Sequence, residues 1–147
     1  AVINDGNRII GIDDSRVYWT AALGTLDRGD DERLVDTATQ NPWLDLNASD
    51  GGNNLAIART VNGVIYVFKL NQVWRLTATG DAVKPYVAKK LSDTVGAVHH
   101  KAVCVGEDNA GNSVVYFLHT GGLYRVGPAG IEYCGRDVEG LTRPTKT

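Results

Sequence analysis

The chain has 147 residues, of which 43% are hydrophobic and 22% charged, and its formal net charge is −2. This composition is typical of one globular domain with a core of ordinary size and excludes a disordered chain. The lack of a basic excess argues against a protein that grips nucleic acid through phosphates, and no apolar run approaches the roughly 18 residues of a membrane helix. Because the sequence begins at Ala1 and contains no Met, we expect a processed chain or a fragment.

Short strands, rather than helices, are predicted along the whole chain. Glycine is abundant, with 17 residues, and the apolar runs are short and rich in Val, Ile, Tyr and Trp. No segment keeps the apolar spacing of an amphipathic helix. The sequence therefore predicts an all-β fold, with residues 1–147 forming a single domain.

A hairpin pattern occurs three times in chain order, near residues 8–21, 64–77 and 114–126. The second copy reads VIYVFKLNQVWRL and the third reads VVYFLHTGGLYRV, at an interval of 50 residues. The first copy, RIIGIDDSRVYWTA, lies 56 residues before the second. An ordinary hairpin gives no reason for later copies, whereas a repeat architecture does, and this period is close to that of the longest propeller repeats.

Each hairpin has a further apolar run on either side, which makes four strands per repeat. These outer runs lie at 56–59 and 86–91 in the middle repeat, and at 102–105 and 131–134 in the last. Four antiparallel strands per 50 residues is the unit of a β-propeller blade. The sequence predicts a β-propeller-like array of about three four-stranded antiparallel blades. Because a closed propeller needs four or more blades, we expect a larger or an oligomeric propeller to complete it.

Equivalent positions of the hairpins are candidates for contacts between blades. The candidate interface residues are Tyr66, Trp74, Arg75, Tyr116, Tyr124 and Arg125. We expect the four aromatic side chains to be mostly buried, with Trp74 and Tyr124 wedged between blades, as are Tyr18 and Trp19 of the first hairpin. The two arginines are expected to pair across strand, blade or subunit boundaries while their stems pack.

No catalytic residue, metal site or cofactor is predicted, and we expect the protein not to be an enzyme. His99 and His100 would point to opposite faces of a strand, which prevents them from chelating one ion. The acidic segment at 27–32 fits no calcium-loop spacing and is interpreted as a solvated turn. Cys104 and Cys134 are too few for a disulfide framework, so we expect two reduced, buried thiols and a cytoplasmic origin.

The order of motifs in the second half resembles β-propeller proteins of tailed-bacteriophage virions, found in tail, stopper or nozzle components. The motifs are VWRLT, KKLSDTVGAVHHKAV, VVYFLHTGGLYRV and EYCGRDVEGL, within about residues 64–141. The matching positions are Tyr66, Trp74, Arg75, Ser92, Asp93, Gly96, His100, Tyr116, Phe117, Gly122, Tyr124, Arg125 and Asp137. The departure from this family is size, since the chain supplies only about three blades.

This resemblance implies a virion structural protein, a ring-forming component of the tail or head–tail connector. Its partners would be further copies of itself and neighbouring virion proteins, with passage of DNA but no specific binding and no membrane contact. It would be assembled in the host cytoplasm and found in the virion. Two alternatives remain: a general protein-interaction propeller, and a carbohydrate-binding module. The latter would use exposed residues, namely Trp19, Trp43, Asn53 and Asn54.

Overall fold

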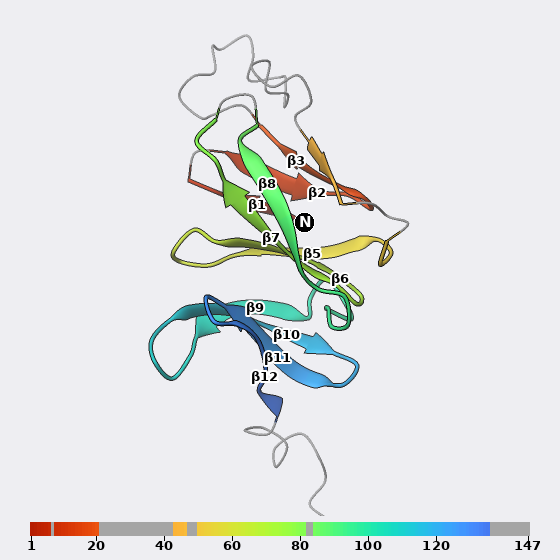
Figure 1. Cartoon of the computed structure of the whole chain (residues 1–147), viewed down its shortest axis with the longest axis vertical. Coiled ribbons are helices and arrows are strands. Elements are labelled where there is room, and N and C mark those ends of the chain that lie inside the picture. The colour runs from red at the N-terminus through yellow and green to blue at the C-terminus, as the bar shows by residue number, and fades with distance from the viewer. Residues whose placement is uncertain (7, 21–42, 47–49, 82–83, 136–147) are drawn as a thin grey trace, which may run out of the picture.

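The computed structural model describes residues 1–6, 8–20, 43–46, 50–81 and 84–135. These residues form twelve β-strands and no α-helix. The strands make three separate four-stranded antiparallel sheets, each built from four strands that are consecutive in the chain. The all-β prediction and the four-strand repeat unit are therefore confirmed. The three sheets follow one another along the long axis of the molecule (Figure 1).

Sheet 1 carries the first predicted hairpin in its two central strands. Its strands, in spatial order, are β1 (Val2–Asn4), β2 (Ile9–Ile12), β3 (Arg16–Trp19) and β4 (Trp43–Asp45). The turn between β2 and β3 is closed by Asp13, whose carboxylate accepts hydrogen bonds from the backbone N–H groups of Ser15 (3.0 Å) and Arg16 (2.7 Å). This is the local bonding that makes Asp a favoured turn residue.

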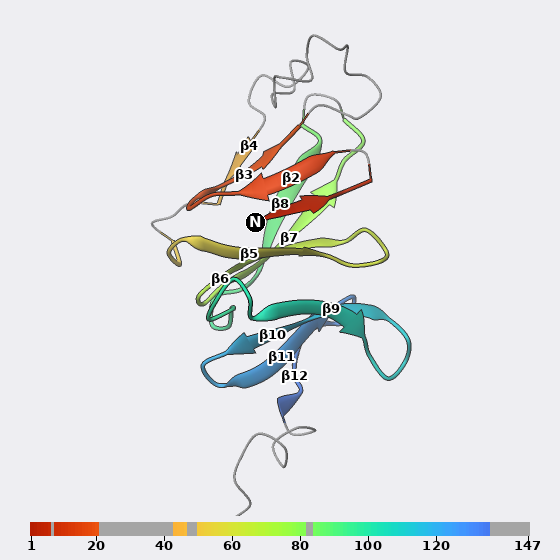
Figure 2. The ribbon, with the colours of Figure 1, turned by 180° about the vertical axis from the view of Figure 1, so that it is seen from behind.

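Sheet 2 lies in the middle of the molecule and carries the second hairpin. Its strands are β5 (Asn54–Arg59), β6 (Ile65–Lys69), β7 (Val73–Ala78) and β8 (Tyr86–Ser92). Every residue of β6 is buried. A strand that is apolar on both faces must be covered on both sides. Sheets 1 and 3 supply this cover (Figures 1 and 2).

Sheet 3 carries the third hairpin. Its strands are β9 (Val103–Glu107), β10 (Ser113–His119), β11 (Gly122–Gly127) and β12 (Gly130–Tyr133). The turn between β9 and β10 is closed by Asp108, which accepts hydrogen bonds from the N–H groups of Ala110 and Asn112, both at 2.9 Å. The three hairpins predicted near residues 8–21, 64–77 and 114–126 are therefore confirmed, with turns near 13–16, 70–72 and 119–122.

Equivalent strands of neighbouring sheets lie next to one another. The first strand of each sheet contacts the first strand of the next, so that β1 meets β5 and β5 meets β9. At the opposite edge, β8 contacts both β4 and β12. Figure 2 shows β1, β5 and β9 in succession on one side of the molecule. Each sheet therefore packs on the next with first strand beside first strand and fourth strand beside fourth strand.

Candidate assembly interface

Each sheet has two faces, and the hairpin register assigns each residue to one of them. We call face A the side that carries three cross-strand pairs: Ile10 with Trp19 in sheet 1, Tyr66 with Arg75 in sheet 2, and Tyr116 with Arg125 in sheet 3. Face B is the opposite side of each sheet. It carries the adjacent cross-strand pairs, which are Gly11 with Tyr18, Val67 with Trp74, and Phe117 with Tyr124. The same intervals of 56 and 50 residues relate these pairs. The sequence repeat is therefore a structural repeat.

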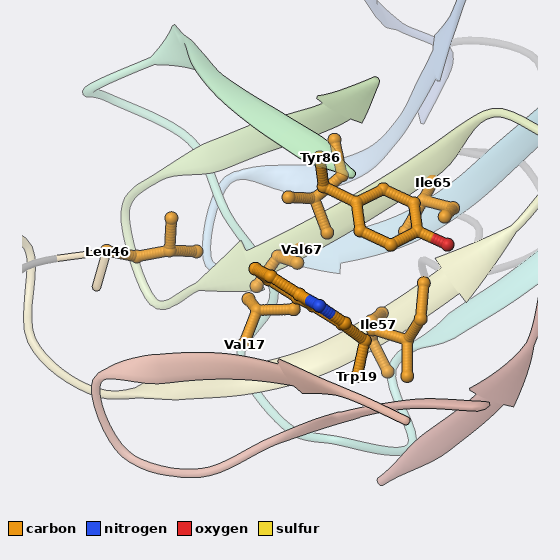
Figure 3. Close-up of a cluster of buried hydrophobic side chains, with 9 residues drawn as sticks. Val17, Trp19, Leu46, Ile57, Ile65, Val67 and Tyr86 are labelled. Atoms are coloured by element: carbon orange, nitrogen blue, oxygen red, sulfur yellow. The ribbon is translucent and has the colours of Figure 1, made fainter. Parts of the chain in front are cut away.

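The first seam joins face A of sheet 1 to face B of sheet 2. Trp19 lies at its centre with 3% of its surface exposed, and its ring centroid is 5.4 Å from that of Tyr86 (Figure 3). Val17 from sheet 1, with Ile65 and Val67 from sheet 2, completes the apolar filling. The expectation that Trp19 wedges between two repeats is confirmed.

The second seam joins face A of sheet 2 to face B of sheet 3. The rings of Phe68 and Phe117, both without exposed surface, lie 5.0 Å apart across it. Tyr124 stacks on Phe117 at 5.8 Å, within sheet 3. Tyr66 is 2% exposed, and burial raises the pKa of its hydroxyl. Both seams thus have the same construction, face A against face B, with aromatic rings in contact.

The six candidate interface residues are divided between these seams and the outer surface. Tyr66 is buried in the second seam, whereas Trp74 and Tyr124 are half-buried on the B faces that enter the first and second seams. The prediction that all four aromatic residues are mostly buried is confirmed: Tyr66 is fully buried, and the other three keep only a minor part of their surface exposed. Tyr116 is half-buried because face A of sheet 3 has no described sheet against it.

Arg75 and Arg125 occupy equivalent positions but have different surroundings. Arg125 donates from Nε and Nη2 to Glu132 Oε2, at 3.0 and 2.6 Å, on the adjacent strand β12. The prediction of pairing is confirmed for the neighbouring strand, but within the described residues this pair does not cross a sheet boundary. Arg75 faces Lys89 in the register instead of a carboxylate. Its Nε is buried, with no hydrogen-bond partner among the described atoms.

A polar network, which sequence reasoning missed, holds the connection between sheets 1 and 2. We call it the polar joint; its members are Asp50, Lys69, Gln72, Trp74, Lys90 and Asp93. The centre of the joint is Lys69, a fully buried lysine at the end of β6. Its Nζ donates to the carbonyl oxygens of Leu46 (2.6 Å) and Asp50 (2.8 Å). Burial lowers the pKa of Lys69, opposed by the nearby Asp50. The only signal in the sequence is one lysine closing an otherwise apolar run.

The charged groups of the polar joint neutralise one another. Lys90 Nζ lies 2.7 Å from Asp50 Oδ2 and 2.8 Å from Asp93 Oδ1. Gln72 donates to both carboxylates and accepts from the Trp74 indole N–H at 2.9 Å. The Nζ atoms of Lys90 and Lys69 also lie 5.6 and 5.9 Å from the Trp74 ring, within the range of cation–π attraction. The joint is therefore a self-satisfied structural network.

The connection between sheets 2 and 3 uses the residue equivalent to Lys69, which is His119. Its Nδ1 accepts a hydrogen bond from the Gly96 N–H at 3.3 Å. Gly96 has no space for a side chain, since a Cβ would stand 2.0 Å from the Lys69 carbonyl oxygen. In the motif that carries the resemblance, Ser92 Oγ accepts from the N–H groups of Thr94 and Val95. Ser92, Gly96 and His119 thus hold the connection between β8 and β9 in place, against the turn between β6 and β7.

The residues of the carbohydrate alternative do not form one exposed surface. Trp19 and Asn54 are 3% and 7% exposed, so the expectation that they are exposed is wrong. The repeat places Trp19 on face A, where sheet 2 covers it. Trp43 is half-buried, with the Arg16 guanidinium 4.8 Å from its ring centroid and the Tyr18 ring at 6.5 Å. Asn53 is exposed.

The histidine and cysteine predictions need correction. His99 and His100 lie in the connection before β9 rather than on a strand, and their rings lie 4.0 Å apart. The argument from opposite strand faces is therefore wrong. Cys104 and Cys134 are both free, but Cys104 is exposed, not buried, because it lies on face A of sheet 3. Cys134 is buried as predicted.

The remaining predictions concern metal-binding groups, the acidic segment and membrane-spanning helices. Within the described ranges, no group of three or more His, Cys, Asp or Glu side chains could hold a metal ion. The acidic segment at 27–32 and the motif position Asp137 lie outside the described residues. In the part of the chain that the structure describes, no helix has the length and apolar character needed to cross a membrane.

Comparison of the chain with protein-family models, with curated proteins and with solved structures finds no match.

Proposed function

We propose that the chain is a non-enzymatic structural protein of a tailed-bacteriophage virion, a component of the tail or of the head–tail connector. Its three sheets act as blades of a β-propeller and build a ring by packing blade against blade. The observation that carries this proposal is the pattern of Tyr116 and Arg125 on the outward face of sheet 3. It repeats that of Tyr66 and Arg75, which sheet 3 covers. Face A of sheet 3 thus repeats a face that is buried within the chain, and we propose that a partner covers it.

The polar joint supports a structural role over a catalytic one. The ammonium group of Lys90 is held between Asp50 and Asp93, and that of Lys69 is held by two backbone carbonyls. A catalytic centre normally leaves at least one such group directed at a substrate. These groups instead fix the connection between two sheets, which is the requirement of an assembly unit.

Neighbouring virion proteins and further copies of this chain are the proposed partners. The net charge of −2 suits a ring through which DNA passes, because strong attraction to phosphates would hold the DNA in place. The protein would join the virion in the cytoplasm of the host cell.

Antibody labelling of virions tests this proposal. An antibody against the chain should bind purified particles of the phage whose genome encodes it, at the tail or the head–tail junction, as seen by electron microscopy. Disrupted particles should also yield the chain in fixed stoichiometry by mass spectrometry. Intact particles that contain no such chain would overturn the proposal.

A further inference from the structure

We propose that two copies of the chain join head to tail and close a ring of six sheets, which deepens and rests on the proposed function. In this ring, face A of sheet 3 in each copy packs against face B of sheet 1 in the other copy. The occupant of each outward face is thus a second copy of this chain. Sheets added by a longer polypeptide and sheets of another protein are the competing outcomes of the test.

The two outward faces are equivalent, by the repeat, to faces that pack together within the chain. In both described seams a face A is covered by the face B of the next sheet, with equivalent strands in contact. Among the described residues, one face A and one face B lie outside these seams, on sheets 3 and 1 respectively. Since the internal seams already join surfaces of these two kinds, the two outward faces of separate copies can join in the same way.

The outward faces carry exposed apolar side chains. Leu118, on face A of sheet 3, is 48% exposed, and Val2 and Ile9, on face B of sheet 1, are 72% and 41% exposed. The equivalent residues in the two described seams, Phe68, Ile57 and Ile65, are buried. A third seam of the same construction would place Tyr116 opposite the aromatic pair of Tyr18 and Trp43. The known seams oppose aromatics in this manner, as Trp19 and Tyr86 do.

The charges of the two outward faces permit this contact. Face A of sheet 3 carries the ion pair of Arg125 and Glu132. Face B of sheet 1 carries Arg16 opposite Asp45 in the register. Each face therefore combines a cation and a carboxylate with apolar and aromatic side chains, and neither presents charge of one sign to the other.

Ring closure sets the number of copies. Propellers typically contain four to eight blades. The described part of one copy supplies three sheets, so two copies supply six and three copies would supply nine. A head-to-tail interface produces a closed ring if its rotation closes and an open filament if it does not. Closure at two copies is the choice that keeps the number of sheets within the usual range of propellers.

A cysteine crosslink identifies the third seam. Cys104 is equivalent to Ala58 and Ile3, and Val2 is equivalent to Ile57 and Val103. Across the two described seams, Ile3 packs in the same apolar cluster as Ile57, and Ala58 in the same cluster as Val103. The third seam would therefore bring Cys104 of one copy beside Val2 of the other.

The experiment uses Val2→Cys in a chain that also carries Cys134→Ser, treated with a short bifunctional thiol crosslinker. We expect a covalent dimer with two crosslinks and no longer ladder, and a native mass of two chains by light scattering. Val87→Cys is the matched control, because Val87 is also an exposed valine (47%) but lies on the middle sheet. It should give no covalent dimer. Adding Cys104→Ser to the Val2→Cys chain should abolish the product.

A second pair of variants separates assembly from folding. Leu118→Lys places a charge on outward face A and should convert the dimer to a monomer with an unchanged circular dichroism spectrum. Val87→Lys should leave the dimer intact. A monomer at every concentration, a ladder of open oligomers, or a complex in virions with a different protein at these faces would overturn the six-sheet ring. A monomer that still labels virions would leave the structural role in place, whereas a closed dimer absent from virions would overturn that role alone.

Discussion

The ring of Trp19 from sheet 1 lies 5.4 Å from the ring of Tyr86 from sheet 2, and the two planes are tilted by 58°. This contact spans the first seam and joins residues whose strands never pair by hydrogen bonds. Tyr86 also donates its hydroxyl to Asp5 Oδ2 at 2.6 Å, and Asp5 in turn pairs with Arg59 Nε at 2.9 Å. Sheet 1 is thus held on sheet 2 both by aromatic packing and by polar contacts.

Trp19→Ala should strongly destabilise the protein. A large cavity at the centre of a seam costs about 3–5 kcal/mol for a fully buried aromatic side chain. The free energy of unfolding, measured by urea denaturation with circular dichroism, gives this loss. Trp43→Ala, measured at a dilution at which the protein is monomeric, is the control, because Trp43 is half-buried on an outward face of the single chain, and it should cost less than half as much. Equal losses would contradict the assignment of faces.

Gly96→Ala should disrupt the connection between sheets 2 and 3. Its Cβ would stand 2.0 Å from the Lys69 carbonyl oxygen and 2.7 Å from the backbone of Leu70, so the backbone must move. Overpacking of this kind costs about 1–3 kcal/mol or more. Gly121→Ala provides the comparison, since its nearest atom would lie at 3.5 Å. Thermal melts of both variants test the difference, and a Gly96→Ala protein as stable as Gly121→Ala would refute the close approach.

The polar joint should weaken in acid. The hydrogen bond from Lys90, aided by that from Gln72, lowers the pKa of Asp50 below its ordinary value of about 3.9. A carboxyl group with a lowered folded-state pKa stabilises the protein above its unfolded-state pKa, and this contribution is lost as pH falls through the folded-state pKa. We expect the stability of Asp50→Asn to depend less on pH below about 4. Asp50→Glu should keep more of the dependence. Identical acid profiles for Asp50→Asn and the parent protein would contradict this role.

The two thiols should react in a fixed order. Cys104 is exposed and Cys134 is buried, with its Sγ 3.5 Å from the Leu123 carbonyl oxygen. A chromogenic disulfide reagent should therefore modify Cys104 first in dilute folded protein, and Cys134 only when denaturant is added. Cys104→Ser should remove the fast phase. If Cys134 reacted as fast as Cys104, this would contradict the burial of Cys134 at the end of sheet 3.

Strand positions were predictable because the hairpins carry local information. The alternation of apolar residues and the polar turns at 13–16, 70–72 and 119–122 are set by neighbouring residues. Burial depended on which sheet covers which face, and this is a long-range property. Tyr66 and Tyr116 have the same place in their repeats, yet only Tyr66 has a sheet against it. Coverage by sheet 2 likewise buries Trp19, which the carbohydrate alternative needs to be exposed.

The polar joint was not predictable from spacing. Lys69 bonds to carbonyl oxygens of Leu46 and Asp50, which precede it by 23 and 19 residues. No repeat marks this contact, because the equivalent residues of the other hairpins are Asp13 and His119. Asp13 accepts hydrogen bonds within its own turn, and His119 accepts one from the Gly96 N–H, so neither makes the contacts of Lys69.

The burial of every residue of β6 has a consequence for how the molecule comes apart. Because its two faces fill different seams, the middle sheet keeps all of its apolar contacts only while both neighbours are in place. The chain thus behaves as a short linear array in which each unit depends on the units beside it. Amide protons of β6 should exchange most slowly, since exposing them requires the array to open from an end. Fraying would then begin at the terminal sheets, and a unit added at either end would slow it.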